Sequence, residues 1–143
     1  MVHIFKTVST VGISQAQMRK VVSAVLSRVG RSADDVSIHW VGAERMRTLN
    51  RRYRGKDRPT DVLSFAAEEG WHIMKQAARD LGDVFLCVPQ IERQAKQYGV
   101  TYIEEATRML AHGVLHLAGF DHRSRKEAKT MFGIQEKIVR AAL

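Results

Sequence analysis

Three histidines near the C-terminus constrain this chain more than any other feature. His112 and His116 are four residues apart, and His122 follows after Gly119. Because residues four apart share one helix face, with Cβ atoms roughly 5–6 Å apart, the first two imidazoles can hold one metal ion. Gly119 can adopt the left-handed conformation that ends a helix, which lets the chain bring His122 towards the same ion. Three nitrogen ligands with an open fourth position are typical of a catalytic zinc site.

The spacing H-x-x-x-H-x-x-G-x-x-H is also the ligand frame of the metzincin proteases, with one difference. Those proteases carry a glutamate directly after the first histidine, and its carboxylate takes a proton from zinc-bound water. Here that position is Gly113. The sequence therefore predicts a zincin-like three-histidine metal site whose chemistry is not ordinary peptide hydrolysis.

Composition places this site in a small basic protein. A chain of 143 residues is long enough for one ordinary domain, covering 1–143, and too short for two. Lys and Arg number 23 against 15 Asp and Glu, so the formal charge is +8, which favours polyanions as partners. The single cysteine, Cys87, excludes an internal disulfide and fits a reducing compartment. No apolar run reads as a signal peptide or a membrane span, so we expect a cytoplasmic protein without a membrane partner.

Hydrophobic periodicity predicts about four strands and about five helices. The strands are expected at residues 2–8, 36–41, 62–65 and 81–88. The helices are expected at residues 14–30, 43–54 and 89–98, from 101 through 116, and from 124 onward. Because strands and helices do not alternate regularly, the predicted fold class is α+β, a single domain with a small mixed sheet packed against the helices.

Some positions receive more specific expectations. His39 alternates with core-facing residues of its strand, which favours a place on the surface. Phe132 and Gln135 fall on the expected inner face of the last helix. Residues 66–79 have no firm pattern, and we expect a flexible loop with a helical turn, of unassigned role.

A row of basic residues leads from the second helix into the loop before the third strand. These residues are Arg47, Arg51, Arg54, Lys56 and Arg58. Arginines recurring at three- to four-residue steps are usually just a solvated helix face. Here a glycine and a proline break the helix and place further cations in a turn, where they can meet a phosphate without displacing core residues.

Three blocks of this sequence resemble the YbeY family of metal-dependent endoribonucleases, which act in ribosomal RNA maturation. One block is His112-Gly-x-Leu-His116-Leu-x-Gly119-Phe-Asp121-His122. The others are Asn50-x-x-Tyr-Arg-Gly-Lys-Asp-x-Pro-Thr-Asp-Val-Leu-Ser-Phe65 and Leu81-Gly-Asp83 with its following strand. Ala66 departs from the pattern, because the family often has proline there.

The resemblance implies one zinc ion per chain, held by His112, His116 and His122, and a functional arginine at Arg54. It also implies a cytoplasmic, single-strand-specific endoribonuclease that acts on ribosomal particles, in maturation of the 3′ end of 16S ribosomal RNA and in ribosome quality control. Ribosomal RNA is then the main partner, with ribosomal proteins or assembly GTPases as further ones.

Our mechanistic hypothesis assigns catalytic roles to Arg54 and His112. Zinc lowers the pKa of a bound water to about 7, and Arg54, if its loop folds over the site, stabilises charge on the phosphate. Attack by metal-activated water and attack by the RNA 2′-hydroxyl both remain open. Weaker contacts with RNA are expected from Lys56, Arg58, Arg51 and Arg47.

Two aspartates are candidates for supporting the metal site, and two other functions are possible for this chain. Asp121 or Asp83 could orient a ligand imidazole from behind, and Asp121 could equally cap the last helix. One alternative function is a zinc metalloprotease with another base, such as Asp83 or Glu105. The other is a non-catalytic ribosome-assembly factor in which the metal only fixes the fold.

Overall fold

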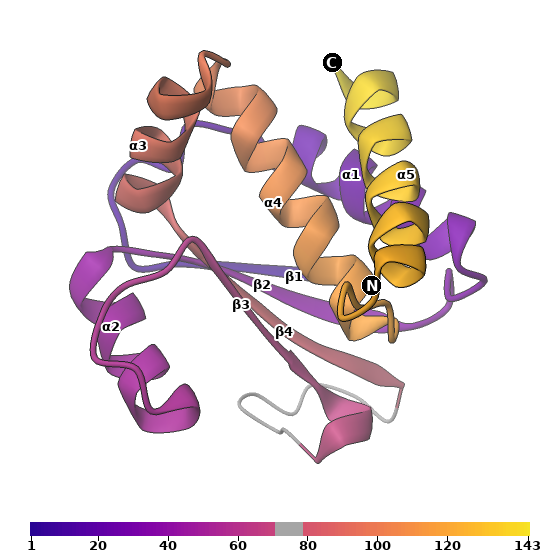
Figure 1. Ribbon diagram of the computed structural model, residues 1–143, viewed down its shortest axis with the longest axis horizontal. Helices are drawn as coiled ribbons and strands as arrows, with labels where there is room; N and C mark the ends of the chain where they lie inside the picture. The colour runs from indigo at the N-terminus through magenta and orange to yellow at the C-terminus, as the bar shows by residue number, and fades with distance from the viewer. Residues whose placement is uncertain (71–78) are drawn as a thin grey trace.

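The computed structural model describes residues 1–70 and 79–143, which form a four-stranded sheet covered by helices (Figure 1). The strands are β1 (Val2–Lys6), β2 (Asp35–Val41), β3 (Val62–Ala66) and β4 (Asp80–Cys87). The helices are α1 (Gln15–Arg28), α2 (Ala43–Arg54), α3 (Val88–Tyr98), α4 (Tyr102–Leu117) and α5 (Arg125–Ala142). The predicted α+β domain is confirmed.

The sheet is mixed, with the strand order β1-β2-β4-β3. The first three strands in that order run parallel to one another, whereas β3 runs antiparallel to β4 and forms one edge. This edge passes beneath α4, the helix that carries His112 and His116 (Figure 1). The topology therefore brings the loop between α2 and β3 close to the histidines.

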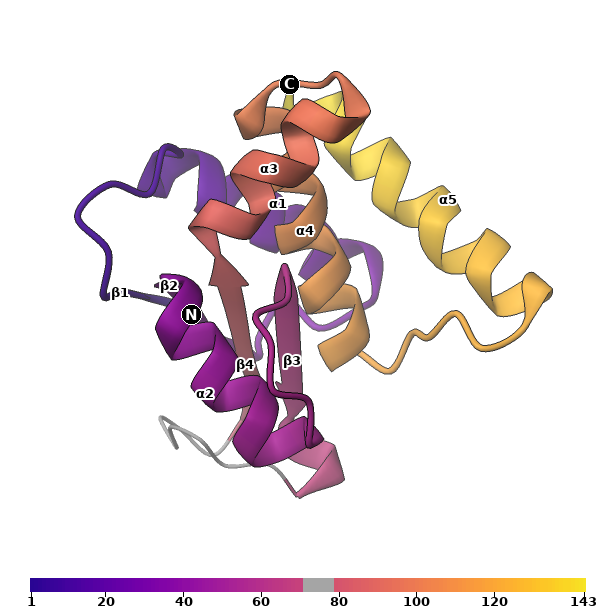
Figure 2. The ribbon, with the colours of Figure 1, turned by 60° about the vertical axis from the view of Figure 1, so that its left-hand side comes forward.

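The two faces of the sheet are covered unequally. Of the helices in the described residues, α1, α3, α4 and α5 lie on one face and α2 packs against the other, as Figure 2 shows. Side chains alternate along β4, so Val84 and Leu86 join the core under α1 and α4, whereas Phe85 and Cys87 join a smaller core under α2. The side chains of β4 thus contribute alternately to two buried surfaces.

Hydroxyl side chains begin three helices as the sequence predicts. Ser14, Thr101 and Ser124 each accept a hydrogen bond from the backbone N–H of the residue three positions later. At Ser124 the capping box is complete, because Glu127 accepts from the Ser124 N–H in return. These caps explain why the predicted helix starts are confirmed within one residue.

The predicted surface position of His39 is wrong. Its side chain is 5% exposed, stacked between the rings of Phe5 and Phe85, with centroid separations of 4.9 and 4.2 Å. Its Nε2 atom lies 2.8 Å from the Asp83 carboxylate. Alternation predicts a surface residue only where one face of a sheet is open, and here α2 covers the second face.

The region after β3, which shows no firm sequence pattern, is described only in part. Residues Ala67–Glu69 form a short 3-10 helix that ends at Gly70, which agrees with the expected helical turn. The rest of that expectation concerns residues 71–78, which lie outside the described residues.

Replacing Gly133 by alanine is expected to stabilise the fold. Gly133 lies in the exposed interior of α5, and a Cβ atom there would meet no other atom within 4 Å. Glycine in a helix interior costs about 0.5–1 kcal/mol relative to alanine, so Gly133→Ala should raise the free energy of unfolding by about that amount. Urea denaturation measures this gain. Gly30→Ala is the control, because Gly30 has equal space but a φ of +73°, and we expect it to destabilise.

Candidate metal centre and the groove beside it

The three predicted ligand histidines come together. The last turns of α4 carry His112 and His116, and Gly119 adopts a φ of +96°, which confirms the predicted bend. His122 follows in the loop before α5. One ring nitrogen from each histidine lies within 4.8 Å of the others, so this three-histidine group could hold a metal ion. The local pattern predicted it because all three ligands lie within one short stretch.

Partial burial lowers the pKa of the two histidines on α4 and favours their neutral form. Burial lowers the pKa of His116 to about 4, and repulsion from a charged His112 adds to the effect. Burial also lowers the pKa of His112 below its ordinary value. Neutral imidazole is the form that binds a metal, so protons compete weakly for this site.

Gln135 of α5 orients His112. The Nδ1 atom of His112 lies 2.8 Å from Oε1 of Gln135, and the Gln135 amide nitrogen donates to Glu136 at 3.1 Å. With the amide oriented in this way, Nδ1–H donates to Gln135 and Nε2 keeps its lone pair for a metal. Sequence patterns do not indicate this contact, because only the packing of α5 on α4 joins two residues so far apart.

We expect Gln135→Leu to weaken zinc binding by about 10- to 100-fold, because the His112 ring loses the partner that fixes its tautomer and orientation. Gln135→Glu keeps an acceptor at the same atom, so its zinc affinity should be at least that of wild type. Competition with a chromogenic chelator measures both affinities. A leucine variant that binds zinc within twofold of wild type would exclude the assigned role.

Asp121 has neither of its two expected roles. Its Oδ1 atom accepts from the backbone N–H of His122 at 2.7 Å, and this hydrogen bond lowers the pKa of the carboxyl. Its Oδ2 atom pairs with Arg123 at 2.9 Å, and the cap of α5 is Ser124. Asp121 therefore fixes the turn that carries His122, through the backbone and not through an imidazole.

Asp83 lies away from the three-histidine group. It is fully buried and bonds His39 on the face of the sheet that α2 covers. Its neighbour Val84 faces α4, so strand alternation turns Asp83 to the opposite side. The expected role behind a ligand imidazole is therefore wrong for Asp83, and so is its use as a base at the metal.

Glu105, the other base considered for a protease, is also engaged elsewhere. It is 1% exposed, pairs with Arg108 at 2.7 Å and accepts from Gln94. Arg108 in turn pairs with Glu136 at 2.9 Å and so joins α4 to α5. The carboxylate thus helps to hold the two helices that carry His112 and Gln135.

Gly113 fills a position where no side chain fits. A Cβ atom there would lie 2.5 Å from Val84 and 3.1 Å from Val62. The Ser64 hydroxyl also donates to the Gly113 carbonyl at 2.9 Å, which ties β3 to α4. The position that holds glutamate in metzincins is here the contact between helix and sheet, which argues further against peptide hydrolysis.

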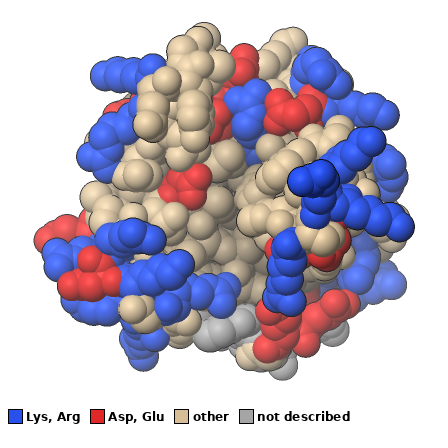
Figure 3. Space-filling model, viewed as in Figure 1, with Lys and Arg blue, Asp and Glu red and all other residues tan. Residues whose placement is uncertain are grey.

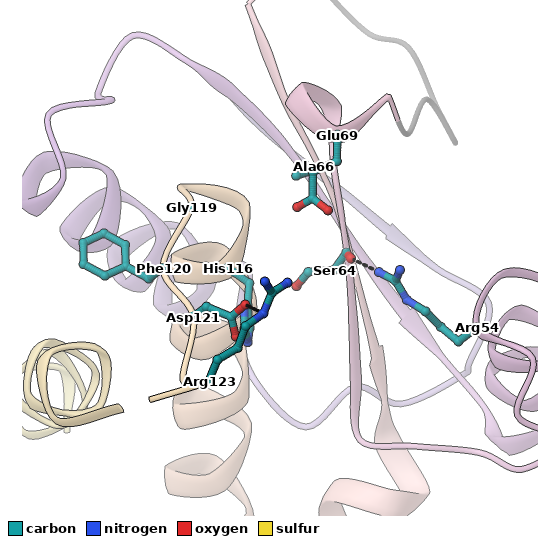
Figure 4. Close-up of a pocket in the computed structure, with 9 residues that line it drawn as sticks. All are labelled: Arg54, Ser64, Ala66, Glu69, His116, Gly119, Phe120, Asp121 and Arg123. Atoms are coloured by element: carbon teal, nitrogen blue, oxygen red, sulfur yellow. Dashed lines mark hydrogen bonds and ion pairs between the residues drawn. The ribbon is translucent and has the colours of Figure 1, made fainter. Parts of the chain in front are cut away.

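Arg54 and His116 line one cavity of about 290 Å³, together with Ser64 and Glu69 (Figure 4). Arg54 ends α2, and its guanidinium donates to the Ser64 carbonyl at 2.8 Å. The same group lies 4.9 Å from the centre of the Phe65 ring. The structure therefore holds the predicted arginine at the β3 edge, across the strand from His116, where both side chains line the same cavity (Figure 4).

Two of the remaining predicted cations, Lys56 and Arg58, lie beside this cavity. Lys56, Arg58 and Arg54 line a neighbouring depression, where Asn50 donates to the Arg58 carbonyl at 2.8 Å and holds the loop. Arg47 binds Asp57 through two nitrogens, at 2.8 and 3.0 Å. Arg51 lies 3.7 Å from the same carboxylate, so Arg47 and Arg51 are the weaker of the predicted phosphate contacts.

A second group of basic residues was not predicted. In Figure 3, Lys and Arg side chains gather on two sides of a hollow that has few charges. One side is the α2 group already named. The other, the α5 group, consists of the exposed residues Arg123, Arg125, Lys126 and Lys129. Four cations within seven residues after His122 are the signal in the sequence that could have identified them.

Phe132 is also placed differently from its prediction. It was expected on the inner face of α5 but is 41% exposed, with its ring beside those of His112 and His122. The neighbouring Met131 and Gln135 take the inward positions. The helix is thus rotated slightly from the orientation that the apolar pattern suggested.

Together, the fold and the site define a small α+β domain whose three-histidine group, suited to a metal ion, lies beside a hollow flanked by basic residues. The model of the family Endoribonuclease YbeY matches residues 3–142. On this basis the chain belongs to the YbeY family.

Curated relatives and a solved structure agree with this assignment. The Endoribonuclease YbeY of Lactobacillus gasseri is 45% identical over 118 residues, which cover 77% of this chain and 67% of that protein. The Endoribonuclease YbeY of a Sulfurihydrogenibium species is 40% identical over 134 residues, which cover 93% and 86%. The solution structure of TM1509 from Thermotoga maritima matches with a TM-score of 0.64 at 27% identity, over 99% of this chain and 89% of that one.

Proposed function

We propose that this protein is a zinc-dependent endoribonuclease that cleaves single-stranded RNA. The observation that carries the proposal is the shared cavity, in which Arg54 lies across from His116 of the three-histidine group. A metal ligand and a guanidinium on opposite walls can act on the same phosphate. The family's relatives, named as endoribonucleases, support the same reaction class.

The donor set suits zinc. Three neutral imidazoles, one of them backed by Gln135, match the ligand type and number of catalytic zinc sites. When bound, zinc supplies a Lewis acid that polarises a phosphoryl oxygen and lowers the pKa of a coordinated water to about 7. Among the described residues, the metal-ligating group contains three side chains, which leaves a fourth position for water or substrate.

Arg54 supplies the positive charge for the phosphate. Its hydrogen bond to Ser64 and its place over Phe65 hold the guanidinium at the cavity wall. From there it would stabilise the negative charge that develops on phosphate oxygens during cleavage. His112 acts with it as a ligand, and Lys56, Arg58 and Arg51 contact flanking phosphates as positioning groups.

We also propose ribosomal RNA as the substrate, with cleavage at the 3′ end of 16S ribosomal RNA and a part in ribosome quality control. Ribosomal particles, ribosomal proteins or assembly GTPases in the cytoplasm would then be the partners. The charge of +8 supports binding to a polyanion. Separately, none of the helices in the described residues is long and apolar enough to cross a membrane.

Cleavage by an arginine variant tests the proposed role of Arg54. Arg54→Ala should retain one zinc per chain and lose about 10²- to 10³-fold in kcat on a labelled unstructured RNA, the usual effect of removing one donor to transition-state charge. Arg52→Ala is the matched control, because it removes an adjacent exposed arginine that contacts Tyr53 and does not line the cavity. An unchanged kcat for Arg54→Ala would exclude the proposed role of Arg54 in stabilising phosphate charge.

The same assay separates the other functions. A matched RNA duplex should be cut far more slowly than the single strand, and casein should remain intact. Casein digestion without RNA cleavage would favour a protease, and zinc-dependent folding without turnover would favour an assembly factor. Mapping the new RNA ends decides the route, because a 2′-hydroxyl attack leaves a cyclic phosphate and attack by water does not.

A further inference from the structure

Phe132 offers an aromatic surface next to the three-histidine group. Its ring centre lies 5.7 Å from that of His122 and 6.1 Å from that of His112, with interplanar angles of 22° and 18°. The ring therefore runs nearly parallel to two of the ligand imidazoles. With 41% of the residue exposed, it reaches the solvent at the metal centre itself.

Packing in the hydrophobic core does not account for this position. Met131, Ile134 and Ile138 make the buried face of α5, and Phe132 does not belong to the core that they join. Full burial of a phenylalanine ring stabilises a fold, and this exposed ring forgoes part of that gain. The ring is thus available to something that arrives at the site.

We propose that Phe132 is the stacking platform for an unpaired nucleobase next to the phosphate at the three-histidine group. This inference rests on the proposed RNA cleavage. Aromatic side chains stack on any base, because every base has a π-face, so such a platform selects no sequence. It selects unpaired nucleotides, since a base inside a duplex is covered by its neighbours and cannot stack on a side chain.

The charges around Phe132 complete a nucleotide subsite. Lys129 precedes it by three residues, so the two share one face of α5, and Lys129 is exposed. Arg125 lies one further turn towards the N-terminus of the helix. A base on Phe132 would therefore have cations nearby for its own phosphate, apart from those of the α2 group on the other side of the hollow.

A double-mutant cycle between protein and substrate tests the platform. Short unstructured RNAs with one mapped cleavage site are prepared intact and with a single abasic residue on either side of the scissile phosphate. Wild type should lose about 5- to 150-fold in kcat/KM at one abasic position, the range for one base–aromatic stack. Phe132→Leu should lose a similar factor on intact RNA and nothing further at that position, whereas Phe132→Trp should keep the wild-type pattern.

The controls separate stacking from a structural role. If Phe132 only supported the histidines, Phe132→Leu would weaken zinc binding and slow every oligonucleotide by the same factor, and an additive cycle of this kind would overturn the inference. The same cycle is also measured with the dissociation constant for RNA binding to the zinc-loaded protein. A wild type that binds RNA without cutting it would therefore refute the proposed function, while the binding cycle still decides the role of Phe132.

Discussion

His116→Ala is expected to lose stoichiometric zinc and, with it, RNA cleavage. The substitution removes one of three imidazoles, and the loss in zinc affinity should exceed the roughly 10- to 100-fold effect of removing an outer partner such as Gln135. Metal content after dialysis and cleavage of a labelled single-stranded RNA measure the two losses together. His3→Ala, on β1 and away from the group, is the matched histidine control and should change neither.

The fold should survive this substitution without its metal. The cores on both faces of the sheet, under α1 and α4 and under α2, are built from apolar side chains that do not depend on the site. Circular dichroism and urea denaturation of metal-free His116→Ala should therefore give a cooperative transition. An unfolded variant would favour the assembly-factor alternative, and a folded variant that still cuts RNA would exclude the metal site as the catalytic centre.

The second large effect is expected from Gly113→Glu, the substitution that would restore the glutamate of the metzincin pattern. A Cβ atom alone would lie 2.5 Å from Val84, so Gly113→Ala should already destabilise by about 1–3 kcal/mol, despite the better helix propensity of alanine. Glutamate adds the cost of an unpaired carboxylate against the sheet, and we expect little folded protein. Urea denaturation of the alanine variant gives the number.

Gly133→Glu is the control for that pair, because it places the same side chain in the open interior of α5 and should be tolerated. Equal stability of wild type and Gly113→Ala would mean that α4 can move away from β3 and β4 without cost. In that case the argument from geometry against peptide hydrolysis would fail, and casein digestion by a Gly113→Glu variant would have to be tested.

Sequence reasoning succeeded where the relevant residues are close together in the chain. The three histidines and the bend at Gly119 lie in one stretch, so helical spacing alone predicted the group. The caps at Ser14, Thr101 and Ser124 gave the helix starts for the same reason. Arg54 required more: its charge pattern indicated a phosphate contact, but only the fold brought it to the cavity of His116.

Apart from Asp121, whose contacts are with its immediate neighbours, the errors concern contacts between distant segments. His39 seemed exposed because no pattern in β2 reports that α2 covers that face of the sheet. Asp83 was placed at the metal from its charge, although alternation against Val84 turns it to the other side. Gln135 lies on the inner face of α5 as expected, but its contact with His112 depends on how α5 crosses α4. Phe132 is exposed because the apolar pattern does not determine the rotation of α5 about its axis to within a fraction of a turn.

Zinc titration of the stripped wild-type protein tests the central claim most directly. The chelator-treated chain is supplied with increasing zinc, and bound metal and the rate of single-stranded RNA cleavage are measured in the same samples. We predict no cleavage without zinc and a rate that rises in proportion to bound metal up to one ion per chain. Full cleavage by the zinc-free protein, or one bound zinc per chain without any cleavage, would contradict the account.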